Sequence, residues 1–441
     1  MLSFEEARLQ YEDFKIYKMP RLQKLNDYYN AKHKILRKST RSNGKEPTRA
    51  VNNFAKYIST ITTGYFIGSP ITYAYTDEGN ESFEEFQKIF KCNTESSNNA
   101  DIALYMSIYG KGYELNYIDE ESKYNFAALD PRNVIAITDG KIKPSVTDAI
   151  VFDEVFLKDD KVKVTMTIYD DSEVVEYEYI KYKSSTSNFS FEEKNRYKHN
   201  LAFCPVIEYR NNRYGKGDCE DVIDLIDAYN EAISSSIDDV KDFTDAFLKL
   251  KNLSGTTDDD IEKIKQNKVI LVDGDGDADW LVKNVNDTYS ENIKNRLAKD
   301  IHKFSFTPDL SDEDFAGNLS GVAIKCKFQS LEQLRQEKER WFYKGLLKRL
   351  LLINDYLSKY NKSIDLYNLE VKFKANLPIN NNELIQNVNN LSSVISHKTQ
   401  LSMLPFIQDV DNELDQIAEE KNLKVNPYKV RSFNKGDDID E

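Results

Sequence analysis

The sequence predicts an α+β protein built from several parts. A chain of 441 residues exceeds what one hydrophobic core usually supports, so two or three compact regions are expected. Between about residues 100 and 210, short segments rich in Tyr, Val, Ile and Thr alternate with turn residues, which is typical of an antiparallel sheet. After residue 218, apolar residues recur every three or four positions over long stretches, which indicates helices.

Composition narrows the class of protein. Hydrophobic residues make up 40% of the chain, which excludes global disorder. The formal net charge of -14 argues against a protein that grips nucleic acid over its whole surface, because neutralising phosphates needs clustered Lys and Arg. No apolar run is long enough to span a membrane, and acids stand where a signal peptide needs a basic start. We therefore expect synthesis in the cytoplasm and no membrane contact.

The N-terminal part, 1–45, is expected to be a charged helical arm that is helical to about residue 42. It ends in the basic run KHKILRKSTR (32–41), followed by the turn signal Asn43-Gly44. This run is either a solvated helix end or a contact with DNA or a neighbouring subunit.

Residues 46–217 are expected to form one mixed region. Apolar spacing predicts a helix over 51–69 that breaks between Gly64 and Pro70, and then a strand at 71–75. A polar hinge with two glycines, 211–217, ends the region. Five further strands are predicted at 113–118, 134–137, 149–156, 162–168 and 174–182.

A long amphipathic helix is predicted for 218–252, and its polar face is unusually acidic. Between Asp218 and Asp245 there are ten acids against one base, Lys241. This face is either ordinary solvated surface or, if copies of the helix line a closed ring, the wall of an anionic hole that does not adhere to a passing polyanion. The candidate channel-facing residues are Asp224, Asp227, Glu231, Asp238 and Asp242.

An insert at 253–284 follows, with a short helix near 258–266 and strands near 268–272 and 280–282. Its run DGDGDAD resembles the start of an EF-hand, but from Asp273 the sixth position is Ala278 instead of Gly and the twelfth is Asn284 instead of Glu. We interpret the run as an acidic surface turn and expect no metal.

A second helix is predicted at 285–305, and the loop FTPDLSDEDFAGNLS (306–320) interrupts the helical pattern. Residues 321–379 are expected to form a long helix, with a kink at Gly345, and a returning strand. Two or three helices are predicted in 380–423, around Pro405, and a disordered tail in 424–441.

Sites for chemistry are not evident. The chain has no P-loop motif, so ATP hydrolysis is not expected, and its four histidines are scattered without partners at ligand spacing. We expect no catalytic residues and no cofactor. The widely spaced cysteines are interpreted as small buried hydrophobic residues: Cys92, Cys204, Cys219 and Cys326.

Seven segments in order along the chain carry a resemblance to the portal proteins of tailed phages of the SPP1 type. The most recognisable is NNFAKYISTITTGYFIGSPITY at 52–73; in the first segment Ala31 stands where the family usually has Gly. The others are 25–36, 107–119, 203–212, 221–230, 309–325 and 374–391.

The resemblance implies a portal fold with an α/β wing, a helical stem, a small α/β clip, a long kinked helix and a helical crown, in a ring of about twelve subunits. Laid on this sequence, it gives an arm at 1–45, the wing at 46–217, stem helices at 218–252 and 285–305, the clip at 253–284, a tunnel loop at 306–320, the long wing helix and returning strand at 321–379, the crown at 380–423 and the tail at 424–441.

The resemblance also implies a role and partners. The ring would be the head-tail connector at one capsid vertex of the virion, assembled in the host cytoplasm, through which double-stranded DNA is packaged and ejected without sequence readout. Its other partners would be major capsid and scaffolding proteins, and at the clip the terminase large subunit and a head-completion adaptor. The implied residues are, for the tunnel loop, Asp309, Asp312, Glu313, Asp314, Phe315, Asn318 and Lys325, and, for the clip, Asp273, Asp275, Asp277 and Trp280.

Two other functions remain open from the residues alone. A metal-dependent nucleic-acid-processing enzyme would need a tight carboxylate cluster within one monomer. A non-portal structural protein of the virion would assemble without a central channel.

Overall fold

The computed structural model describes most of the chain and divides it into two compact units. Unit 1 comprises 1–316 and 327–376, and unit 2 comprises 317–326 and 377–441. The described residues are 2–41, 44–76, 80–182, 191–243, 247–251, 257, 262, 277–281, 287–311, 321–376, 381–404, 407 and 410–425.

The N-terminal arm packs on a sheet. Helix α1 (Phe4–Asp13) starts at a capping box made by Ser3 and Glu6, and continues through a π-helical turn (Phe14–Lys18) into α2 (Met19–Tyr29). Its buried aromatic side chains meet the sheet, with Phe4 against Tyr177 at 5.0 Å between ring centroids. The expectation of helix to about residue 42 is wrong beyond Tyr29, because Ala31 takes a left-handed conformation and the chain then runs through a short 3-10 turn (Lys34–Arg37) into extended backbone.

Two antiparallel sheets follow. The larger has the order β4-β5-β6-β7-β8, and the smaller has β3-β2-β9. All five strands predicted for this region are present, as β2, β4, β5, β6 and β7, and the structure adds β3, β8 and β9. The bounds are β2 (Lys111–Ile118), β3 (Tyr124–Leu129), β4 (Val134–Thr138), β5 (Val146–Phe156), β6 (Lys161–Tyr169), β7 (Glu173–Tyr182), β8 (Phe191–Lys198) and β9 (Val206–Arg210).

Helices cover the smaller sheet. The helix predicted at 51–69 is α3 (Phe54–Ile67); it continues through Gly64 and leads into β1 (Thr72–Tyr75). Helices α4 (Glu81–Cys92) and α5 (Glu95–Tyr109) were not predicted. The expected strand pattern from about residue 100 is wrong as far as Tyr109, because Ile102, Ala103 and Met106 are buried at helical spacing.

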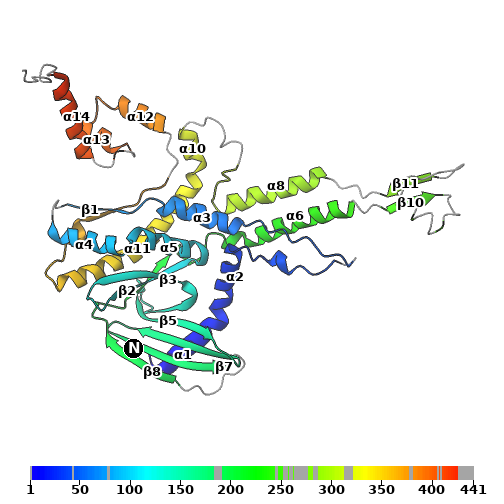
Figure 1. Ribbon diagram of the computed structural model, residues 1–441, viewed down its shortest axis with the longest axis horizontal. Coiled ribbons are helices and arrows are strands. Elements are labelled where there is room, and N and C mark those ends of the chain that lie inside the picture. Colours follow the sequence, from blue (N-terminus) through cyan, green and yellow to red (C-terminus); the bar gives the residue numbers. More distant parts are fainter. Residues whose placement is uncertain are drawn as a thin grey trace, which may run out of the picture. The chain divides into compact units, whose positions relative to one another are not determined.

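The two helices predicted on either side of the insert are α6 (Ile223–Phe243) and α8 (Asp287–Phe304), which lie side by side in Figure 1. We refer to this pair of helices as the stem. The prediction of helix from 218 to 252 is too long. A 3-10 turn (Glu220–Val222) precedes α6, and Phe247–Lys251 is strand β10, paired antiparallel with β11 (Asp277–Leu281). The alternating sequence FLKLK has the period of a strand, which explains the change. The predicted helix at 258–266 and strand at 268–272 lie outside the described residues.

The long helix is interrupted at Phe328, between α10 (Gly321–Lys327) and α11 (Gln329–Ser358). Gly345, the expected kink, lies within α11 against the buried Tyr209 ring, where an added Cβ would stand 2.5 Å from Cδ1. This glycine therefore serves close packing instead of a bend. The returning strand is β12 (Leu369–Lys372), which pairs with β1.

Unit 2 contains the predicted C-terminal helices, α12 (Asn381–Asn390), α13 (His397–Ser402) and α14 (Val410–Val425). Helix α14 runs into the start of the predicted tail, and 426–441 lies outside the described residues.

The cysteine prediction holds for two of four residues. Cys204 and Cys219 are buried, and burial raises the pKa of each thiol to about 12. Cys92 and Cys326 are exposed, contrary to the prediction.

Candidate functional site

The acidic face of α6 is covered by the segment that follows helix α2. We call residues 33–41 and 44–52 the strap. It runs outward along α6 from His33, whose Nδ1 lies 2.9 Å from Asn230 Nδ2, to Arg41, which pairs with Asp242. It then returns to Asn52, whose N–H donates to Asn230 Oδ1 at 2.8 Å.

Charged contacts hold the outer part of the strap. Lys38 Nζ is 2.7 Å from Glu231 Oε1, and both Arg41 and Lys45 pair with Asp242. The hydrogen bond from Arg41 holds the pKa of Asp242 below its ordinary value. Because these side chains are partly exposed, each pair is worth little alone, but together they fix the strap along about three turns of helix.

Polar contacts hold the returning part. The Thr48 N–H donates to Asp238 Oδ1 at 2.9 Å, and the Ala50 N–H donates to Ser234 Oγ at 3.0 Å. Asp238 is only 4% exposed. Burial acts to raise the pKa of Asp238, but the hydrogen bonds from Thr48 outweigh it and hold that pKa low.

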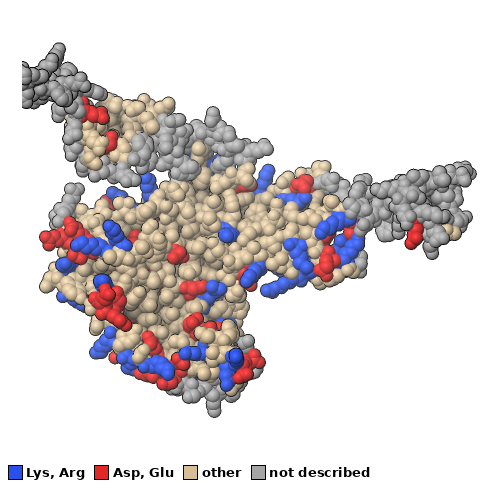
Figure 2. All heavy atoms as spheres, viewed as in Figure 1, with Lys and Arg blue, Asp and Glu red and all other residues tan. Residues whose placement is uncertain are grey.

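Four of the five predicted channel residues therefore share one feature. Asp227, Glu231, Asp238 and Asp242 all bond to the arm or the strap of their own chain, with Asp227 accepting from Tyr28 Oη at 2.6 Å. Figure 2 shows Lys and Arg interspersed with Asp and Glu on the stem. The acids are evident in the sequence but their partners are not, because the partners lie about 190 to 200 positions away.

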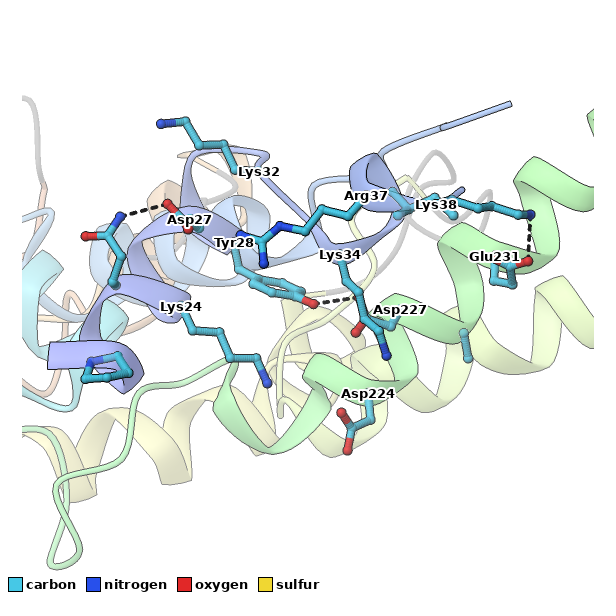
Figure 3. Close-up of a pocket in the computed structure, with 14 residues that line it drawn as sticks. Lys24, Asp27, Tyr28, Lys32, Lys34, Arg37, Lys38, Asp224, Asp227 and Glu231 are labelled. Carbon is cyan, nitrogen blue, oxygen red and sulfur yellow. Dashed lines mark hydrogen bonds and ion pairs between the residues drawn. The ribbon is translucent and has the colours of Figure 1, made fainter. Parts of the chain in front are cut away.

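A groove of about 970 Å³ lies between the arm and the first turns of α6. Figure 3 shows Lys24 and Lys34 pointing toward Asp224 and Asp227 on its floor. The Lys24 ammonium lies 5.8 Å from the centre of the Tyr28 ring. The groove is thus lined by both signs of charge, and it does not present a continuous cationic surface.

One face of α6, next to its acidic face, and one face of α8 carry exposed apolar side chains. On α6, Ile237 is 38% exposed and Val240 63%; on α8, Tyr289 is 65% exposed and Ile293 37%. The two helices meet along a different side, where Ser236 Oγ and Ser290 Oγ are 2.9 Å apart. Ile233, Ile237 and Val240 form the α6 stripe, and Tyr289 with Ile293 forms the α8 stripe.

The root of the predicted tunnel loop, 305–311, is held between α3 and α8. Tyr57 Oη donates to the Pro308 carbonyl at 2.9 Å and accepts from the Leu310 N–H at 3.1 Å. His302 Nδ1 lies 3.1 Å from the Thr307 carbonyl, and His302 Nε2 lies 3.7 Å from Asp309 Oδ2. Neither Tyr57 nor His302 was singled out from the sequence.

Other predicted loop and clip residues are only partly described. Asp309 lies in the root and Lys325 is exposed on α10. On β11, Asp277 is opposite Lys251 and Trp280 is opposite Leu248. Outside the described residues lie Asp312, Glu313, Asp314, Phe315, Asn318, Asp273 and Asp275.

A buried polar centre anchors the base of the stem and was also missed. Lys338 Nζ on α11 lies 2.6 Å from Asp218 Oδ2, with side chains 2% and 1% exposed. The Asp218 carboxylate also accepts from Thr62, Ser107 and Asn211. No local pattern distinguishes this aspartate from its nine acidic neighbours; only its long-range partners do.

The described part of the chain contains neither a cluster of metal-binding side chains nor a helix that could span a membrane. No group of three or more His, Cys, Asp or Glu residues there is arranged to hold a metal ion. No helix there combines the length and the apolar character that crossing a membrane requires.

Comparisons with known proteins agree over nearly the whole chain. The family model for phage portal proteins, SPP1 Gp6-like, matches residues 10–426. The portal protein of Bacillus phage SPP1 is 24% identical over 416 residues, which cover 90% of this chain and 80% of that protein. The portal protein of Clostridium phage phiCD119 is 24% identical over 236 residues, which cover 52% of this chain and 51% of its own.

Among solved structures, a chain of "Neck of empty GTA particle computed with C6 symmetry" aligns with 81% of this chain and 90% of its own length. The sequence identity is 11% and the TM-score 0.46.

Proposed function

Because the chain belongs to the SPP1 Gp6-like family of phage portal proteins, we propose that it is one subunit of a closed ring at a capsid vertex, and that double-stranded DNA passes through the channel of this ring. The observation that carries the proposal is the pair of exposed apolar stripes on the stem helices. A ring requires each subunit to offer two different complementary surfaces on opposite sides.

The stripes meet this requirement. At 100° per residue, the α6 stripe lies about a quarter turn from the side of α6 that carries Ser236 and faces α8. The α8 stripe lies about a quarter turn from the side that carries Ser290, in the opposite rotational sense. Because the helices are antiparallel, opposite senses place the two stripes on opposite faces of the pair.

The stripes also lie at the same height. Ser236 is opposite Ser290, so Ile237 and Tyr289 are level, as are Ile233 and Ile293. The α6 stripe of one subunit can therefore pack on the α8 stripe of the next, which buries apolar surface that a lone subunit leaves in water. Repetition of this head-to-tail contact closes a ring of about twelve subunits.

DNA would pass along the stem and the loop after α8. Within the channel, we assign contact with the phosphate backbone to residues 306–320 and Lys325, without base readout. The α6 face with Asp224, Asp227, Glu231, Asp238 and Asp242 would line the stem together with its strap. In this role the chain is a conduit, and the motor chemistry belongs to a separate protein.

The insert 253–284 would be the clip, the docking site for the terminase large subunit and later for a head-completion adaptor. Asp273, Asp275, Asp277 and Trp280 are its proposed contacts. Major capsid and scaffolding proteins would surround the rest of the ring, with 46–217 and 321–379 as the wing and 380–423 as the crown.

The test is electron microscopy with light scattering on the purified protein and two variants. The unchanged protein should form closed rings with a central hole. Ile237→Glu places a charge in the α6 stripe and should leave folded monomers. Asn292→Glu, on the exposed side of α8 away from α6 and from both stripes, should still form rings. Rings from Ile237→Glu would refute the assigned contact, and a stable monomer from the unchanged protein would refute the conduit.

A further inference from the structure

The hydroxyl of Tyr57 bridges the two backbone groups that flank Asp309. It donates to the carbonyl of Pro308 and accepts from the N–H of Leu310. One residue further on, the Ser311 N–H donates to Asp309 Oδ1 at 3.0 Å, and the described part of the chain ends there until residue 321. A single side chain from α3 thus holds the backbone on both sides of Asp309.

The Tyr57 ring is itself held in place. It packs edge-on against His302 at 5.5 Å between ring centroids, and Phe54, one turn earlier on α3, packs edge-on against the same imidazole at 5.7 Å. His302 Nδ1 in turn lies 3.1 Å from the carbonyl of Thr307, which is only 1% exposed. These contacts therefore leave the Tyr57 hydroxyl little freedom to move.

The hydroxyl is suited to bonding on both sides. Burial raises the pKa of Tyr57 and outweighs the opposing hydrogen bond from Leu310, so the group stays a neutral O–H that can donate and accept at once. A phenylalanine would keep the ring contacts and lose both bonds.

We propose that Tyr57 is a positioning residue, which holds the backbone of 307–310 against α3. The proposal rests on the role assigned above to the loop 306–320 in DNA passage. It adds that this role depends on a side chain of α3, an element remote in sequence, and not only on the loop's own residues.

The test compares Tyr57→Phe with Tyr65→Phe. Tyr65 lies two turns further along α3 and donates its hydroxyl to Glu332 Oε2 on α11 at 2.9 Å, so its loss is chemically matched but remote from the loop. In the purified protein, hydrogen exchange of the Leu310 amide, followed in a peptide covering 306–311, should accelerate about fivefold in Tyr57→Phe, because its hydrogen bond to Tyr57 Oη is lost. It should not change in Tyr65→Phe. Equal exchange in both variants would overturn the proposal that Tyr57 holds the backbone of 307–310.

The second readout is the fraction of DNA-filled heads in a packaging reaction with assembled rings. Tyr57→Phe should lower it, while ring formation and the thermal midpoint match those of Tyr65→Phe. A fall of the same size in both variants would assign the effect to general loss of stability and overturn the positioning role. Faster exchange at 306–311 with an unchanged fraction of filled heads would support the hold of Tyr57 on the backbone. It would refute the proposed role of the loop in DNA passage.

Discussion

Removing the buried cation at the base of the stem should destabilise unit 1 far more than removing an exposed one. In Lys338→Met the side chain keeps its approximate length and volume, but the Asp218 carboxylate loses its counter-ion while it remains almost fully buried. An uncompensated buried charge costs about 3–5 kcal/mol. Three hydrogen bonds to Asp218 remain in the variant, so we expect the lower end of this range.

The matched control is Lys88→Met on α4. Lys88 also forms an ion pair, with Glu85, but its side chain is 63% exposed, so its loss should cost less than about 1 kcal/mol. The double variant Asp218→Asn with Lys338→Met removes both charges and should recover part of the loss, because no unpaired ion is left in the core.

The assay is urea unfolding followed by tryptophan fluorescence in a Trp280→Phe background, so that the signal comes from Trp341, which lies on the same helix as Lys338. Urea is preferred to guanidinium because it does not screen ion pairs. A loss for Lys338→Met no larger than that of Lys88→Met would refute the reasoning, as would a double variant less stable than the sum of its two single changes.

Three further outcomes follow from particular contacts. Gly345→Ala should destabilise the folded protein by about 1–2 kcal/mol, because the added Cβ would overlap the buried Tyr209 ring. Gly64→Ala, on an exposed part of α3 where nothing lies within 4 Å of the added Cβ, should stabilise the folded protein by about 0.5–1 kcal/mol. Unfolding midpoints check the sign of both changes. Asp242→Asn removes the negative charge that Arg41 and Lys45 share, and it should increase the retention of DNA by rings at low salt. Arg41→Gln should not increase it; filter binding at two salt concentrations measures both. Arg41 lowers the pKa of Asp242, so their contact contributes stability above the ordinary carboxyl pKa and loses it as the pH falls through the lowered pKa. Hydrogen exchange of the strap amides should therefore accelerate only below about pH 4.

Elements with a regular local period could be predicted from the sequence. The alternation in 162–168 and 174–182 identified β6 and β7, and the apolar spacing in 285–305 identified α8. The errors arose where the period changes within a few residues, as at Phe247, or where one backbone conformation ends a helix, as at Ala31.

The contacts of the site could not be predicted in the same way. Tyr57 and Leu310 are 253 positions apart, and Asp218 and Lys338 are 120 apart. A tyrosine on an apolar helix face and an aspartate among many acids have no local feature that reveals such partners. The resemblance of whole segments to a family supplied the arrangement, but it did not supply these bonds.

The strap changes the physical account of how a stem could let DNA slide. The sequence suggested an excess of anions that repels the phosphate backbone. In the structure, four of the five chosen carboxylates are bonded within the chain, two of them by cations of the strap. A paired surface repels a polyanion less, but it also keeps Lys38, Arg41 and Lys45 bound to carboxylates of the same chain, with which phosphate groups must compete. Low adhesion along the outer part of the strap would thus depend on keeping these three cations engaged, so that losing Asp242 would slow DNA more than losing Arg41.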